Sequence, residues 1–199
     1  MAKAVLISIR PKWVEKILSG EKTLELRKAK PKLETPFKVY IYCTNQKNTI
    51  LWNARSYIYV DDHNHNAFDR CWNGSVVAEF TCDCIDEYDD DTISSYQHED
   101  YARWNDFDLD RACMHPEDFQ NYANGKWLYG WHISDLKIYD QPKPLSAFKG
   151  PCKIKVGCWE CPYFNYTTGD CDGRTIKRPP QSWCYVEAMD GERKDGGDG

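Results

Sequence analysis

The stretch from Val5 to Arg27 combines an apolar run, a proline and a glycine in an order that constrains its local fold. The run Val5–Ile9 is typical of a buried strand. Pro11 follows, and proline is tolerated at the first position of a helix because the N–H it lacks would have no partner there. Gly20 suits the end of a short helix. The sequence therefore predicts a strand, a short helix and a second strand that begins just after Gly20.

The second strand, expected over Lys22 to Lys28, gathers its polar side chains on one face. Successive side chains of a strand point to opposite faces, so two sets result: Leu24 and Leu26 on one side, and Thr23, Glu25 and Arg27 on the other. Lys22 opens the strand, where this alternation does not fix its direction. An arginine can grip a phosphate through two hydrogen bonds, and a glutamate can accept one from the amine of a base. The group suits a nucleobase or a phosphate, although such a strand is also typical of a solvated or ion-paired surface.

The size and charge of the chain limit the ligands to consider. Its 199 residues fit one domain with room for a small satellite lobe. The formal net charge of −5 argues against a protein that coats nucleic acid through a broad basic surface. Basic residues are concentrated between positions 3 and 38, which suits either a local basic pocket or simple solvation. A small ligand or a short single strand therefore fits better than long duplex RNA.

The apolar segments are too short for export or membrane insertion. The run Ala4–Ile9 falls short of the core of a signal peptide, and nothing approaches the ~20 apolar residues of a membrane span. We therefore expect a cytoplasmic protein without membrane contact. In that compartment its ten cysteines would be reduced or metal-bound rather than paired in disulfides.

The rest of the chain predicts several strands and a few helices. Strands are expected at Phe37–Thr44, at Gly74–Ile85, on both sides of Gly130 within Trp127–Tyr139, and at Ser182–Val186. Pro116 marks a helix start between residues 99 and 124, and Pro142–Phe148 is expected to be a loop. This mixture predicts an α+β fold with a small barrel or a strongly bent sheet.

The ordered set of these motifs resembles one known family. Gly20-Glu21-Lys22-Thr23-Leu24-Glu25-Leu26-Arg27 is similar to the GxKxxExR signature of the ASCH domain, a branch of the PUA-like superfamily. The motif Tyr129–Ile133 and the ending Pro180–Val186 resemble ASCH proteins of bacteria and their bacteriophages. The resemblance covers residues 3–149 and 178–188. It implies a small PUA-like β-barrel with flanking short helices and a cleft beside the signature.

The resemblance also implies a class of ligand, RNA or a modified nucleoside or nucleotide. One bacterial branch hydrolyses N4-acetylcytidine with the signature lysine, a threonine and a glutamate. Lys22 matches that lysine, whereas Glu25 occupies the position of the threonine. Three hypotheses follow: a binding module for RNA or a nucleoside, an enzyme (an N-acyl-nucleoside amidohydrolase or a ribonuclease) that uses Lys22, and a protein-interaction module with no ligand in the cleft.

Further residues complete the candidate site. Lys22, Glu25 and Glu79 are the candidate catalytic groups, with Glu79 as a second acid for proton transfer. The candidate ligand-binding residues share positive charge, an aromatic face or a place at the expected cleft mouth: Arg10, Lys22, Glu25, Arg27, Tyr42, Trp131, Gln181 and Ser182. Tyr42, Trp131 and Trp183 offer candidate stacking surfaces for a base, although core packing is the more common role for each of them.

Cysteines define the last region. Cys152, Cys158, Cys161 and Cys171 fall within 20 residues, and the Cys158–Cys161 spacing lets two thiolates reach one tetrahedral ion. Structural zinc would explain how a segment without an apolar pattern folds, with reduced cysteines or an iron–sulfur cluster as alternatives and Cys184 as an alternative fourth ligand. We therefore divide the chain into the ASCH domain (1–149 plus 178–188), a cysteine-rich insertion (150–177) and a disordered tail (189–199).

Overall fold

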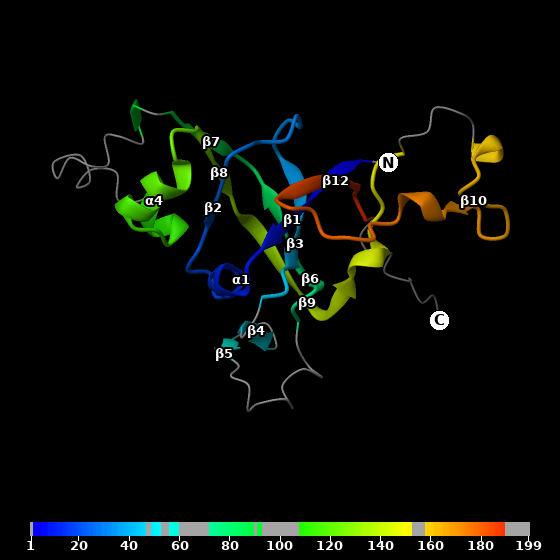
Figure 1. Cartoon of the computed structure of the whole chain (residues 1–199), viewed down its shortest axis with the longest axis horizontal. Helices are drawn as coiled ribbons and strands as arrows, with labels where there is room; N and C mark the ends of the chain where they lie inside the picture. The colour runs from blue at the N-terminus through cyan, green and yellow to red at the C-terminus, as the bar shows by residue number, and fades with distance from the viewer. Residues whose placement is uncertain are drawn as a thin grey trace, which may run out of the picture.

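The computed structural model describes residues 2–46, 49–52, 56–59, 72–89, 91–92, 108–152 and 158–189. The main elements of these residues are a five-stranded and a three-stranded sheet with a few short helices, and two small two-stranded sheets, β4-β5 and β10-β11, accompany them (Figure 1). The strands are β1 (Lys3–Ile9), β2 (Leu24–Arg27), β3 (Phe37–Cys43), β4 (Thr49–Trp52), β5 (Ser56–Tyr59), β6 (Ser75–Cys82), β7 (Ile85–Tyr88), β8 (Leu128–His132), β9 (Ser134–Pro144), β10 (Phe164–Asn165), β11 (Asp170–Cys171) and β12 (Trp183–Glu187). The α-helices are α1 (Pro11–Leu18) and α4 (Pro116–Ala123), and residues 108–112 are also helical.

The five-stranded sheet has the order β12-β1-β3-β6-β9. Strand β1 pairs antiparallel with β12, the edge strand, and parallel with β3, so the first and last of these strands lie side by side at one edge of the sheet. On one face Val5, Ile7 and Ile9 pack with α1 in the main core, while Ala4 and Leu6 join a second cluster on the other face. Both faces of β1 are therefore buried, as expected for a continuous apolar run in an interior strand of a sheet.

The three-stranded sheet has the order β2-β8-β7 and carries the signature strand. Strand β2 runs antiparallel to β8, with Glu25 opposite Trp131 and Arg27 opposite Tyr129. Leu24 and Leu26 are buried in a cluster with Phe119 of α4, which confirms the alternation read from the sequence. The mixed α+β class is confirmed as well. Closure of the two sheets into a barrel stays a prediction.

The expected strand–helix–strand order around α1 is also confirmed. Pro11 is the first residue of α1, and Gly20 follows its C-cap with a φ of +83°, a left-handed backbone that favours glycine. Pro116 likewise starts α4.

Two local predictions, one at Gly130 and one for residues 142–148, were wrong. The break between β8 and β9 falls at Ile133 rather than at Gly130, which lies inside β8. A Cβ at Gly130 would lie 3.0 Å from carbon atoms of both Leu24 and Tyr88, so this glycine marks close packing between neighbouring strands rather than a strand end. Residues 142–148 do not form the expected loop, because β9 continues to Pro144 and a 3₁₀ turn follows at Leu145–Ala147.

The cysteine-rich segment contains a 3₁₀ turn at Cys158–Glu160, the short hairpin of β10 and β11, and a further 3₁₀ turn at Asp172–Arg174. The proposed domain boundaries at 149/150 and 177/178 stay predictions. The expected tail, 189–199, lies outside the described residues after Met189. No helix in the described part of the chain is long and apolar enough to cross a membrane.

Candidate functional site

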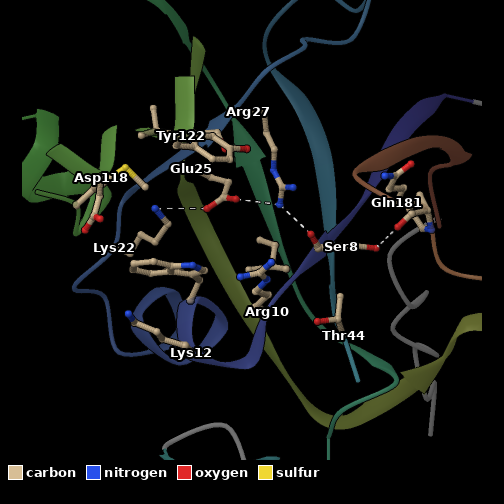
Figure 2. Close-up of a pocket in the computed structure, with 15 residues that line it drawn as sticks. Ser8, Arg10, Lys12, Lys22, Glu25, Arg27, Thr44, Asp118, Tyr122 and Gln181 are labelled. Carbon is tan, nitrogen blue, oxygen red and sulfur yellow. Dashed lines mark hydrogen bonds and ion pairs between the residues drawn. The ribbon is translucent and has the colours of Figure 1, made fainter. Parts of the chain in front are cut away.

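A cavity of about 570 Å³ lies beside the signature strand. Its wall is built from the end of β1, the start of α1, strand β2, helix α4 and the segment before β12 (Figure 2). The lining residues are Ser8, Ile9, Arg10, Lys12, Trp13, Lys22, Glu25, Leu26, Arg27, Thr44, Met114, Asp118, Tyr122, Pro180 and Gln181. Its volume is in the range of small-molecule sites.

Lys22 is almost completely buried, with 3% of its surface exposed. Its Nζ donates hydrogen bonds to the carbonyl oxygens of Leu24 (2.8 Å) and Ala112 (2.7 Å) and lies 3.4 Å from Oε2 of Glu25. These three oxygens match the three N–H donors of an ammonium group, whereas a neutral amine has only two. The side chain therefore ties the start of the signature strand to the helical residues 108–112.

The polar groups continue across the cavity as a chain of charged and hydrogen-bonded contacts (Figure 2). Oε1 of Glu25, a residue only 6% exposed, lies 2.9 Å from Nη2 of Arg27. The same Nη2 donates to the carbonyl of Ser8 (2.8 Å), and the Ser8 hydroxyl donates to the carbonyl of Pro180 (2.7 Å). The chain links β2, β1 and the segment before β12, so it holds these walls in a fixed relation.

Two cations near the opening differ from this paired chain. Arg10 and Lys12 are exposed, and neither forms an ion pair with a residue in the described ranges. Lys12 lies 4.6 Å from the ring centre of Trp13. Counted together, the lining side chains include four cations against the carboxylates of Glu25 and Asp118. The cavity therefore has a positive charge excess that suits an anion.

Helix α4 contributes Asp118 and Tyr122 to the wall. The Tyr122 hydroxyl is 3.4 Å from the carbonyl of Leu26. Burial raises the pKa of Tyr122, although the charges of Arg27 and Arg10 act in the opposite direction. The phenol therefore stays protonated near neutral pH and can donate a hydrogen bond.

The structure brings most of the expected site residues together. Arg10, Lys22, Glu25, Arg27 and Gln181 line the cavity. Ser182 does not line it, but its carbonyl accepts a hydrogen bond from the backbone N–H of Ser8 (2.9 Å), so it helps to position that wall.

Three expected residues lie elsewhere. Tyr42 is 5% exposed in the cluster on the other face of β1, and Trp131 is fully buried in the main core. A base cannot stack on rings that are covered in this way, so the alternative of core packing describes both. Glu79 accepts hydrogen bonds from Tyr139 (2.6 Å) and Lys38 (3.0 Å) and does not line the cavity. Its place gives it no contact with Lys22 or Glu25 across the site.

Sequence reasoning missed Lys12, Trp13 and Tyr122 as lining residues. The helical spacing of Trp13 with Val14, Ile17 and Leu18 is typical of a face packed on the core, yet Trp13 is only partly buried. The basic residues Arg10 and Lys12 beside it were the available signal in the sequence. Tyr122 gave no local signal, since it reaches the cavity from a helix almost a hundred residues after the signature.

The four candidate zinc ligands are all described, and no three of their sulfur atoms lie within 4.8 Å of one another. Some local features nevertheless suit a thiolate site. The N–H of Cys161 donates to the carbonyl of Cys158 (3.1 Å) in a tight turn, and Cys171 pairs with Phe164 in the hairpin that follows. Cys161 is buried, whereas Cys152 and Cys158 are exposed. Structural zinc at this segment stays a prediction.

Comparisons with known proteins identify the fold. No protein-family model matches the chain, and no curated protein does so significantly. The structure is similar to the crystal structure of ASCH from Zymomonas mobilis, with a TM-score of 0.50 and 17% identity over 92% of this chain and 87% of that one. A tyrosine-to-phenylalanine variant of that protein gives a TM-score of 0.51 at 16% identity, covering 94% of this chain and 91% of the other. The chain therefore has the ASCH fold, as its signature predicted.

Proposed function

We propose that the cavity binds RNA or a nucleoside or nucleotide, and that binding rather than catalysis is its primary role. The observation that carries this proposal is the pairing of unneutralised cations with aromatic rings in one cavity. Arg10 and Lys12 offer charge for a phosphate, and Trp13 and Tyr122 offer ring faces for a base. Any base can stack on an aromatic face, so the cavity suits nucleosides, nucleotides or RNA without a requirement for one particular base.

The paired wall supplies a second contact for such a ligand. Nε of Arg27 is buried and makes no hydrogen bond within the described residues. A buried donor without a partner is costly, so an oxygen acceptor bound in the cavity would gain from meeting it. Nη2 of the same guanidinium is already held by Glu25 and by the carbonyl of Ser8. Recognition in this region is therefore preorganised rather than formed on binding.

The arrangement around Lys22 argues against the enzyme hypothesis in its nucleophilic form. A lysine nucleophile must be a neutral amine with a free lone pair, and Lys22 instead has three oxygen acceptors around its Nζ. The residue is better placed to position Glu25 than to attack a substrate. Turnover of N4-acetylcytidine or RNA by the wild-type protein, lost in Lys22→Ala, would reverse this preference.

A binding experiment tests the proposal directly. The probes are a fluorescent short single-stranded RNA, cytidine and cytidine 5′-monophosphate, with affinity measured by anisotropy or by tryptophan fluorescence. Losing one charged hydrogen bond costs roughly 1.5–3 kcal/mol, so we expect Arg10→Ala and Arg27→Ala each to weaken phosphate-bearing probes by about tenfold or more. The control is Lys126→Ala, which removes an exposed cation that does not line the cavity.

The probes also separate the alternatives. Affinity should fall with added salt for the RNA and the nucleotide, because phosphate contacts release counterions. Equal weakening in Arg10→Ala and Lys126→Ala would place the binding surface elsewhere. Absence of binding to every probe would leave the protein-interaction module as the better hypothesis. A cytoplasmic location and a bacterial or bacteriophage origin remain predictions.

A further inference from the structure

A second group of polar side chains lies outside the cavity, where β7 meets the end of β8. It consists of Cys84, Asp86 and His132, and one potential ligand atom from each lies within 4.8 Å of the others. In the described part of the chain this is the one such group of three or more histidine, cysteine and acidic residues. None of its members lines the cavity, so it belongs to a different surface.

The backbone holds these three residues in register. The N–H of His132 donates to the carbonyl of Cys84 (3.1 Å), and the flanking pairs Ile85–Trp131 and Asp86–Gly130 are directly opposite each other in the sheet. The side chains remain accessible: Cys84 is exposed, and the Asp86 and His132 side chains are 36% and 23% exposed. Asp86 and His132 lie on adjacent strands, which hold side chains more rigidly than loops do, and Cys84 directly precedes β7.

The contacts of His132 define which of its ring nitrogens accepts and which donates a hydrogen bond. Its Nδ1 lies 3.1 Å from Nη2 of Arg111, and its Nε2 lies 2.5 Å from Oδ2 of Asp86. A guanidinium can only donate, so Nδ1 accepts from Arg111. The proton of a neutral imidazole is then on Nε2 and is donated to Asp86.

This geometry excludes a cysteine–histidine–aspartate triad. In such a triad one ring nitrogen faces the nucleophile while the other is oriented by the carboxylate. Here Arg111 contacts Nδ1 and Asp86 contacts Nε2, while Sγ of Cys84 is directed to the carboxylate instead, 3.9 Å from Oδ1 of Asp86. His132 therefore cannot relay a proton between Cys84 and Asp86, and an exposed thiol is left beside a carboxylate and a ring nitrogen.

We propose that Cys84, Asp86 and His132 bind one divalent zinc ion, with solvent completing its coordination. One thiolate, one imidazole and one carboxylate form a mixed donor set that suits zinc better than the hard cations Ca²⁺ or Mg²⁺. Binding releases the thiol proton of Cys84 to solvent. His132 stays neutral, but its proton moves from Nε2 to Nδ1 so that Nε2 can hold the metal.

The tautomer change has a consequence for Arg111. With a proton on Nδ1, two donors would face each other, so Arg111 must turn away from His132 when the metal binds. Nη1 of Arg111 already lies 3.5 Å from Asp108, and its Nε lies 3.4 Å from the hydroxyl of Thr23 in the signature. Arg111 therefore opposes metal binding through both its charge and its hydrogen bond, and removing it should strengthen zinc binding.

Alkylation of the wild-type protein tests the site without any substitution. Cys84 is followed by peptide mass spectrometry during reaction with iodoacetamide, with and without Zn²⁺. The free thiolate is the species that iodoacetamide modifies. A Zn²⁺ ion bound to Cys84 would occupy that thiolate, so we expect Zn²⁺ to slow modification of Cys84 by about tenfold, while Cys113 serves as the internal reference. Equal rates at Cys84 with and without Zn²⁺ would overturn the proposal.

Variants then identify the ligands. His132→Gln should abolish the protection of Cys84, and Asp83→Asn, which removes a neighbouring exposed carboxylate outside the group, should preserve it. Arg111→Ala should lower the Zn²⁺ concentration that gives half-protection by several-fold. Circular dichroism of each variant verifies that its fold is intact, and loss of protection in Asp83→Asn would also overturn the assigned ligand set. Protection that survives in His132→Gln would overturn the assigned ligand set, and weaker protection in Arg111→Ala would overturn the tautomer argument.

Discussion

Replacing Lys22 by methionine removes one charge from the buried wall while keeping most of the side-chain volume. The change leaves the carbonyls of Leu24 and Ala112 without their donor, and it leaves Glu25 with Arg27 as its remaining cation. Breaking a buried ion pair costs roughly 3–5 kcal/mol because the surviving charge cannot be solvated. Since Arg27 still compensates part of the Glu25 charge, we expect the lower end, about 3 kcal/mol.

Urea denaturation measures this cost. For a domain of this size the dependence of the unfolding free energy on urea is about 2 kcal/mol per molar, so a loss of about 3 kcal/mol moves the midpoint down by about 1.5 M. The matched control is Lys16→Met, because Lys16 also pairs with a carboxylate, that of Glu21, at 2.7 Å. That pair is exposed, and exposed pairs contribute little to stability, so its midpoint should barely move.

The double variant Lys22→Met/Glu25→Gln separates the ion pair from the rest of the site. Neutralising Glu25 removes the uncompensated charge, so the double variant should be less destabilised than the sum of the single variants, by a coupling of about 1–3 kcal/mol. Equal midpoints for Lys22→Met and Lys16→Met would refute the reasoning. So would strict additivity in the double variant, because both results would mean that Lys22 and Glu25 are solvated.

Three further predictions concern other parts of the molecule. Burial alone would raise the pKa of Glu79, but hydrogen bonds from Tyr139 and Lys38 outweigh burial, so the pKa in the folded protein lies below the usual 4.5. The stability that this carboxylate contributes is therefore present above pH 4.5 and is lost as the pH falls through the lower native pKa. Glu79→Gln should flatten that part of a plot of melting temperature against pH. Gly130→Ala should destabilise the protein by about 1–3 kcal/mol in urea denaturation, because its Cβ would crowd the neighbouring strands, and a neutral result would contradict that packing. Elemental analysis after chelator dialysis should find zinc that Cys161→Ser loses, whereas a metal-free, fully reduced wild type would remove the zinc prediction for the cysteine-rich segment.

The sequence predicted the parts of the site that depend on short-range patterns. Pro11 and Gly20 delimit α1 because each imposes its own backbone preference. Glu25 and Arg27 share a face because strand alternation leaves no other choice once the leucines are buried. The position of Arg10 follows from the same local pattern, because it is the N-cap residue between the end of β1 and the start of α1.

Contacts between residues far apart in the sequence limit how much of the site the sequence alone can predict. Trp131 carries an aromatic ring in a strand beside the signature, and nothing in its local pattern distinguishes a wall of the cavity from the core. The register of β8 on β2 decides the matter by placing it opposite Glu25 and burying it fully. Tyr122 and Trp13 gain their places in the same way, because α4 and α1 approach the signature strand only in the folded chain.

Lys22 shows why a signature alone does not distinguish binding from catalysis. The motif fixes the lysine relative to Glu25 and Arg27, but the acceptor that completes its shell is the carbonyl of Ala112, ninety residues away. With the Ala112 carbonyl as its third oxygen partner, the Lys22 ammonium has all three N–H groups occupied and serves to hold the structure together. Without that carbonyl, the same lysine would have one N–H group left for a substrate. The chemistry of the motif therefore depends on the helical residues 108–112 as much as on the strand itself. A variant that moves this helix away, rather than one that alters the signature, would be the way to free Lys22 for reaction.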